Sequence, residues 1–215
     1  MKTFFLILGL LFVASNATLA ADDCAETAVL KKHVGHYAEK SFWDRLPKAK
    51  VWASAGMAPI SAIDVDDAGV ARAVFAWHEG DTACVQLRGN DLWVKDSSSK
   101  KIKWLGPYIK VSPKAGDETP YLTRIFGQRC YTSNRNDQWC FEPGILKLAG
   151  KSLKAKVHQD TSESPTYGTP LIVHGERAYW VFMPFEDGWK VFKDIGDPEN
   201  PINPKTDRPW RVLKP

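Results

Sequence analysis

The sequence has 215 residues, of which 44% are hydrophobic and 12% aromatic; this is ample material for a packed core and excludes a wholly disordered protein. The net charge of +4 arises from 29 basic and 25 acidic residues that are interspersed along the chain. Because acidic and basic residues are nearly balanced and interspersed, the sequence has no basic stripe of the kind found in nucleic-acid-binding proteins. We therefore expect no nucleic-acid partner.

The first twenty residues have the layout of a secretory signal peptide. Lys2 precedes an apolar run over residues 4–14, and small residues follow as far as Ala21. A membrane-spanning helix needs about 20 apolar residues, so the run is too short for an anchor. We expect residues 1–20 to be cleaved, with no membrane span in the mature chain. The prediction is an exported protein, either secreted or held in a bacterial periplasm.

Residues 25–37 carry the one convincing helical pattern, with Val29, Leu30, His33 and Val34 on an apolar stripe. Later in the chain, apolar and polar residues alternate between turn signals, which predicts roughly ten to twelve short antiparallel strands. We therefore expect an all-β barrel or sandwich with one short N-terminal helix. The single domain would span residues 21–195, and two small β subdomains are the alternative.

Turn dipeptides predict where the strands reverse. We expect two-residue turns at Gly89-Asn90, Gly150-Lys151 and Asp187-Gly188. The last is the strongest signal, because Asp-Gly supplies the positive φ angles of a type I′ turn. The first sets Leu87 opposite Leu92.

The four cysteines of an exported chain predict two disulfides. Residues 130–140 read as two short strands around a loop, in a register that sets Cys130 directly opposite Cys140, within reach of a disulfide. The remaining pair is Cys24 with Cys84. Metal sites and redox dithiols require closely spaced cysteines, which the chain lacks, so we expect structural bridges.

The C-terminal residues 196–215 contain five prolines. Each proline lacks a backbone donor and keeps the residue before it extended. We expect an extended Pro-rich arm rather than a packed element, with Trp210 and Val212 pinning it to the domain.

Motifs for catalysis and cofactors are missing. The chain contains no Gly-x-Ser-x-Gly, no phosphate-binding loop and no dinucleotide fingerprint. His33, His36 and Glu39 follow one another at intervals of three, but Gly35 and the helix end at Tyr37 spoil their geometry as metal ligands. We expect no cofactor and no metal, and we lean against an enzyme.

Nine tryptophans give the best functional hint, because aromatic rings build cavities, sugar platforms and partner hot spots. Most of them are expected in the core. Four lie in less regular contexts, and with a histidine at a turn they form the predicted ligand- or partner-binding set: Trp43, Trp52, Trp104, Trp210 and His78.

The order of a helix, Gly35-His36-Tyr37 and a run of hairpins loosely resembles the lipocalins. That family has tryptophan where this chain has Tyr37. The resemblance implies a barrel that carries a small ligand.

The sequence thus predicts an exported, disulfide-stabilised, non-catalytic binding protein. We expect it to engage a partner protein, in the manner of a periplasmic inhibitor or immunity protein. A lipocalin-like carrier of a small apolar ligand or saccharide is one alternative. An envelope-acting hydrolase with an unrecognised carboxylate or histidine site is another.

Overall fold

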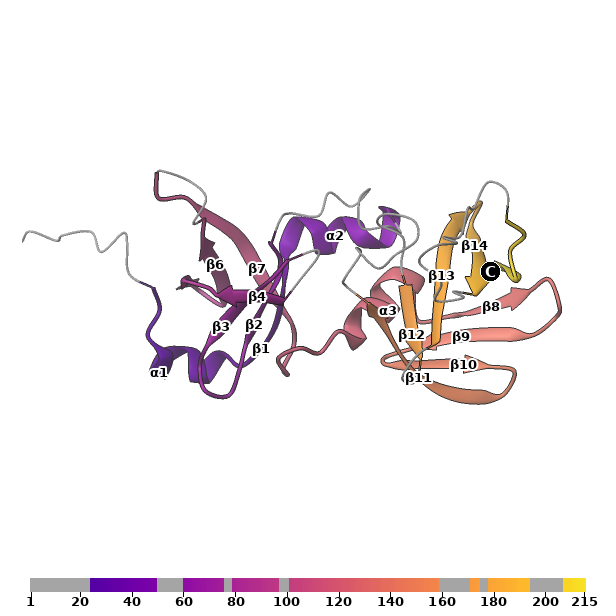
Figure 1. The fold of residues 1–215 in the computed structure, drawn as a ribbon, viewed down its shortest axis with the longest axis horizontal. Helices are drawn as coiled ribbons and strands as arrows, with labels where there is room; N and C mark the ends of the chain where they lie inside the picture. Colours follow the sequence, from indigo (N-terminus) through magenta and orange to yellow (C-terminus); the bar gives the residue numbers. More distant parts are fainter. Residues whose placement is uncertain are drawn as a thin grey trace, which may run out of the picture.

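The computed structural model describes residues 24–49, 60–75, 79–96, 101–158, 171–174, 178–193 and 207–215. The fold is mostly β, as expected, with three short α-helices in this part of the chain. Figure 1 shows one curled sheet at one end of the molecule and a barrel at the other. None of the helices in these ranges has the length and apolar character needed to cross a membrane.

The expected helix over residues 25–37 is much shorter than its pattern suggests. Helix α1 covers Thr27–Leu30, a 3₁₀ turn covers Lys31–His33, and strand β1 begins at once as Gly35–Glu39. Strand β1 is central, with β2 on one side and β7 on the other. Backbone hydrogen bonds on both edges therefore override the local helical spacing.

The first sheet is a seven-stranded antiparallel sheet in the order β4-β3-β2-β1-β7-β6-β5. After β1, its strands are β2 (Ile60–Val65), β3 (Ala71–Phe75), β4 (Glu79–Thr82), β5 (Val85–Arg88), β6 (Asp91–Lys95) and β7 (Trp104–Ser112).

The two edge strands of the first sheet, β4 and β5, are separated by only two residues. Ala83 N donates to Ala71 O at 2.8 Å, and Lys95 N donates to Cys84 O at 2.9 Å. The chain therefore passes at this point from the β3 side of the sheet to the β6 side, and the sheet curls back on itself. The predicted Cys24–Cys84 disulfide ties the N-terminal segment to this crossing.

The barrel closes through eight antiparallel strands. They are β8 (Cys130–Ser133), β9 (Gln138–Glu142), β10 (Ile145–Leu148), β11 (Lys151–His158), β12 (Leu171–His174), β13 (Ala178–Phe185), β14 (Gly188–Lys193) and β15 (Arg211–Lys214). The strands thus form two sheets rather than one, which is the arrangement of the two-subdomain alternative. Gly35-His36-Tyr37, on which the resemblance to the lipocalins rests, lies on β1 of the first sheet and not in the closed barrel.

The expected C-terminal arm is extended at its end, but it is also packed. Arg211–Lys214 forms β15, which pairs with β14 and with β8 and so closes the barrel. No proline lies between Pro209 and Pro215, so the backbone donors that a β ladder needs are present. Leu213 is fully buried.

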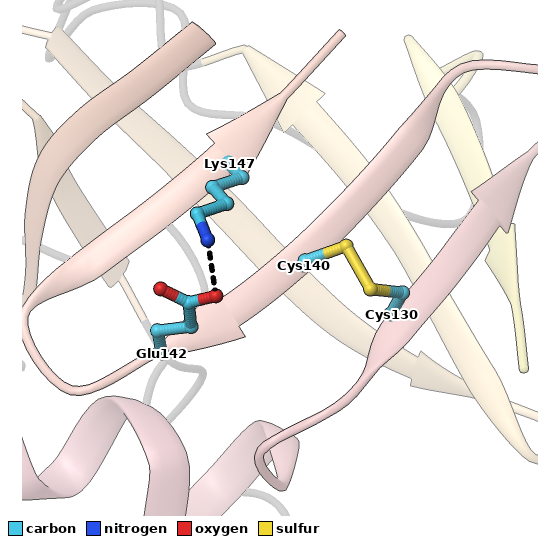
Figure 2. The surroundings of a disulfide bond; sticks show 4 residues. All are labelled: Cys130, Cys140, Glu142 and Lys147. Carbon is cyan, nitrogen blue, oxygen red and sulfur yellow. Dashed lines mark hydrogen bonds and ion pairs between the residues drawn. A yellow bond between two sulfur atoms is a disulfide. The ribbon is translucent and has the colours of Figure 1, made fainter. Parts of the chain in front are cut away.

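The Cys130–Cys140 disulfide joins directly opposed residues of β8 and β9, as predicted. Figure 2 shows it on the barrel wall beside an ion pair in which Lys147 Nζ donates to Glu142 Oε1 at 2.5 Å. Tyr131 and Trp139, the next opposed pair, are buried in the barrel. The alternation of the strands therefore puts the disulfide on the outside.

The predicted hairpins are partly right. The Gly89-Asn90 turn sets Leu87 opposite Leu92, as expected. The other two turns lie one residue earlier, at residues 149–150 and 186–187. At the second of these turns Glu186 has the positive φ, and Gly188 is the first residue of β14.

Two large apolar clusters lie in the described part of the chain, one in the first sheet and one in the barrel, and a small third one groups Val181, Phe192 and Met183. Helix α3 (Thr119–Phe126) packs against β9 and β11, and its Phe126 ring stacks on Phe141 at 4.3 Å between centroids. Helix α2 (Lys40–Ala49) follows β1, yet its Phe42 and Leu46 side chains belong to the barrel cluster. The two helices therefore join the halves of the molecule.

Candidate functional site

Three tryptophans converge at one end of the barrel. Trp139 of β9, Trp180 of β13 and Trp210 just before β15 form a triangle, with ring centroids 5.1, 5.7 and 5.9 Å apart. Two residues farther along β9 and β13, Phe141 and Phe182 contact Phe126 of α3. The tryptophans therefore lie at the end of the barrel away from α3.

Burial decreases across this triangle. Trp139 is fully buried, Trp180 is 6% exposed, and Trp210 is only partly buried. The two inner indoles thus form a packed base beneath Trp210. An aromatic side chain held on such a base loses little conformational freedom when a ligand covers it.

Two cations contact the Trp210 ring. Arg211 Cζ lies 4.2 Å from the ring centroid and Lys193 Nζ lies 4.5 Å from it. Both distances are within the range of cation–π attraction. We call the three tryptophans together with Lys193 and Arg211 the mouth cluster.

Asp137 fixes the buried side of the mouth cluster. Its Oδ2 accepts from Arg211 Nε and from Trp139 Nε1, both at 3.3 Å, and its Oδ1 accepts from the Ser133 hydroxyl. The Arg211 side chain is 11% exposed and that of Asp137 is 19% exposed. Arg211 is thus held in an ion pair, whereas Lys193 is exposed to solvent.

The barrel interior behind the mouth cluster is filled by the protein's own rings. Trp189, Phe182 and Phe141 are all fully buried, and each contacts Phe126. Any molecule recognised here would therefore meet the basic and aromatic surface of the mouth cluster rather than the ring-filled interior.

The three predicted site residues that the structure describes, Trp43, Trp104 and Trp210, lie in different places. Trp210 belongs to the mouth cluster. Trp104 begins β7 in the first sheet, where Arg88 Cζ lies 5.9 Å from its ring centroid. Trp52 and His78 lie outside the described residues, and their assignment stays a prediction.

Trp43 lies between the two halves of the molecule. Its ring contacts Tyr121 of α3 edge-on at 5.0 Å, and Arg124 Cζ lies 5.1 Å from its centroid. The Trp43 backbone carbonyl accepts from Arg124 Nε at 3.0 Å. These contacts explain its partial burial by packing alone.

Lys193 was not among the predicted site residues, although the strand pattern indicates that it lies at the end of the barrel. Trp189 and Val191 alternate with Lys193 along β14, and both are fully buried in the barrel. A lysine in register with buried residues at a strand end indicates a barrel mouth, because only there does its ammonium reach water.

The second polar cluster lies at the junction of the two halves. His36 of β1 is 1% exposed; its Nδ1 lies 2.7 Å from Asp64 Oδ1, and its Nε2 lies 3.2 Å from the Tyr121 hydroxyl. Burial, with the charges of Glu118 and Asp64, raises the pKa of Tyr121 above its usual range. We call His36, Asp64 and Tyr121 the junction clasp; its buried imidazole and phenol favour a structural role.

The histidine spacing noted in the sequence does not form a ligand set. His36 lies on a strand, and the Glu39 carboxylate is used to cap α2, where it accepts from Ser41 N at 3.1 Å and from Phe42 N at 2.5 Å. Within the described ranges, no group of three or more His, Cys, Asp or Glu side chains could hold a metal ion.

The mouth cluster offers noncovalent chemistry: an indole face, an exposed ammonium and a guanidinium held by a carboxylate. Such groups recognise apolar and anionic surfaces together. No protein-family model matches the chain, and comparison with curated proteins and with solved structures gives no significant match.

Proposed function

We propose that this is an exported, disulfide-stabilised, non-catalytic binding protein that engages a partner protein through the mouth cluster. The mode of action would be that of a periplasmic inhibitor or immunity protein, which occludes its target. The observation that carries the proposal is Trp210, partly exposed on a packed aromatic base with Lys193 and Arg211 against its ring.

The composition of the mouth cluster supports protein recognition. Tryptophan and arginine are the residue types most enriched among interface hot spots, where a few side chains carry most of the binding free energy. Here a tryptophan and an arginine are adjacent, and Asp137 holds the arginine in place. The anchor is therefore organised before a partner arrives.

The filled barrel favours a surface partner over a carried ligand. A small apolar ligand inside the barrel would have to displace Phe126, Phe141 or Phe182, which contact one another in the core. Truncating such a ring costs about 3–5 kcal/mol of stability. Displacing one would carry a comparable penalty.

The charge of the mouth cluster points to an acidic patch on the partner. Lys193 is exposed, and complementary charges at an interface accelerate association and make it sensitive to salt. Export is supported by the two disulfides, because such bonds persist in oxidising compartments and are rare in the cytosol.

The test is capture of a partner by the oxidised mature protein, followed by calorimetry for the affinity and stopped-flow fluorescence for the association rate of single variants. Trp210→Ala should weaken binding by about 30-fold or more, as expected for a hot-spot tryptophan. Lys193→Glu, at an exposed position that leaves the core intact, should slow association and reduce its dependence on salt. Trp104→Ala, a partly buried tryptophan of the first sheet, is the matched control and should bind as the wild type does.

Two results would overturn the proposal. Recovery of no stoichiometric partner from envelope or extracellular fractions would remove the partner-protein function. A captured partner that binds the wild type, Trp210→Ala and Lys193→Glu with equal affinity would show that the mouth cluster is not the binding surface.

A further inference from the structure

A second surface with its own chemistry lies on the first sheet. Along β5 and β6 the residues Val85, Leu92 and Val94 are buried in the apolar cluster, so the alternate residues face outward. Together with the residues that lead into β7 they form a surface, basic on balance, that we call the hairpin face: Gln86, Arg88, Asp91, Trp93, Lys95, Lys101, Ile102, Lys103 and Trp104.

Two indoles and a guanidinium form the floor of the hairpin face. Arg88 Cζ lies 4.4 Å from the Trp93 ring centroid and 5.9 Å from that of Trp104, and both rings are partly exposed. A Cβ on Gly106 would lie 3.3 Å from the Trp93 ring. The missing side chain at Gly106 therefore lets the Trp93 ring pack closely on β7.

Ile102 stands out at the edge of this floor. Its side chain is 52% exposed, and it is one of two large hydrophobic side chains that are exposed in the described part of the chain. Lys101 and Lys103 on either side are exposed as well, and Trp104 follows directly. An apolar side chain is thus presented between two ammonium groups and beside an indole.

We propose that the hairpin face docks on the surface of an anionic phospholipid bilayer. Ile102 enters the boundary between headgroups and acyl chains, as apolar residues of interfacial elements do. The Trp104 indole lies at headgroup level, where amphipathic rings are enriched. Lys101 and Lys103 meet the anionic headgroups, where each basic residue adds to membrane affinity.

The exposed isoleucine favours a bilayer over a soluble polyanion. A polyanion needs only cations, and an exposed branched aliphatic side chain adds nothing to that attraction. A bilayer uses both, because apolar insertion and headgroup attraction act together. The hairpin face lies on the first sheet and the mouth cluster on the barrel (Figure 1), so the two surfaces are separate.

The test uses the full mature chain and vesicles of phosphatidylcholine with or without phosphatidylglycerol, by co-sedimentation and tryptophan emission. The wild type should bind only the anionic vesicles, with a blue shift that high salt reverses. Lys101→Glu with Lys103→Glu should lower the partition coefficient by about 30-fold or more, since each lost lysine contributes about fivefold. Ile102→Ser should reduce both binding and the blue shift.

Lys151→Glu with Lys154→Glu is the matched control, because it makes the same change of charge at two exposed lysines of the barrel. It should bind as the wild type does. Equal binding to both kinds of vesicle, or to neither, would overturn the proposal. So would binding to a soluble sulfated polysaccharide that Ile102→Ser leaves unchanged while vesicles are not bound.

Discussion

Buried tyrosine hydroxyl groups form hydrogen bonds to backbone carbonyl groups inside this β-rich core. The Tyr37 hydroxyl donates to His33 O at 2.7 Å, and the Tyr131 hydroxyl donates to Phe126 O at 2.8 Å. Tyr108 likewise donates to Ile60 O at 3.1 Å. Each phenol donates its proton to a carbonyl oxygen, and for Tyr37 and Tyr108 burial also favours the neutral form of the side chain.

This preference for the neutral form predicts how stability changes at high pH. Burial raises the pKa of Tyr37 to about 12, from an ordinary value of 10.0. A folded-state pKa above the unfolded one gives stability that is complete below pH 10.0 and is lost as the pH rises toward 12. Absorbance at 295 nm and circular dichroism, followed together against pH, measure the ionisation and the unfolding.

Tyr37→Phe is the comparison variant, and it should lack one phenolate of the wild-type absorbance change near the upper end of that range. The assignment would be contradicted if Tyr37 ionised near pH 10.0 while the circular dichroism stayed native. Tyr108 adds to the same trend, because burial and the nearby Glu39 charge raise its pKa as well.

Strand β15 lies between β14 and β8 in the closed barrel, and it approaches β14 very closely. A Cβ on Gly188 would lie 1.9 Å from Leu213 O. No side chain fits in that space, so the first residue of β14 has to be glycine for β15 to pair there.

Gly188→Ala should therefore force β15 away from β14 and destabilise the protein by about 1–3 kcal/mol, the range of an overpacked core. Urea unfolding gives the free energy, and hydrogen exchange gives the protection of the β15 amides. Gly89→Ala is the control for backbone strain: its Cβ would meet no atom within 4 Å, but its φ of +66° disfavours alanine, so this variant should lose some stability while the β15 amides stay as protected as in the wild type. If the β15 amides stayed as well protected in Gly188→Ala as in Gly89→Ala, the close approach would not matter.

Gly188 also explains why the register of its hairpin could not be predicted from the sequence. Asp187-Gly188 has the composition of a type I′ turn, but the turn lies one residue earlier because Gly188 is needed against Leu213. Gly89 has no such tertiary neighbour, and its hairpin register was predictable from the dipeptide. Local turn chemistry is reliable where no distant strand requires the same residue.

The prediction of a helix over residues 25–37 was wrong for a related reason. Its apolar spacing is local, whereas β1 is defined by pairing with residues about 30 and 70 positions away, a separation that no short window of sequence contains. In the candidate site, Trp210 was predictable as an aromatic in an irregular context. Its partners were not, because the β strands that bring Trp139, Trp180 and Lys193 to it are far apart in the chain.

At the scale of the whole molecule, the two sheets are coupled through helices and the junction clasp. Helix α2 leaves the first sheet and places Phe42 and Leu46 in the barrel cluster. Helix α3 contacts the first sheet in turn, because its Tyr121 hydroxyl lies 3.2 Å from Nε2 of His36 on β1. The halves thus share an apolar contact and a polar one, and we expect them to unfold in one transition.

Phe42→Ala should separate that single transition into two. Phe42 is 1% exposed, and its truncation should cost about 3–5 kcal/mol, mainly from the barrel side of the junction. Hydrogen exchange in urea, compared for β3 and β11, measures the two halves independently. Val29→Ala, at a 40% exposed position of α1, is the control and should leave the unfolding of both sheets coincident. Coincident unfolding in Phe42→Ala would contradict the coupling.

The disulfides have a further consequence for how the chain reaches this structure. Cys24 joins Cys84 and Cys130 joins Cys140, so the first cysteine pairs with the second and the third with the fourth. A catalyst that oxidises cysteines in the order in which they emerge makes only native bonds on such a chain. Each half can therefore be cross-linked by the time the next pair appears, and no isomerase is needed to reshuffle the bridges.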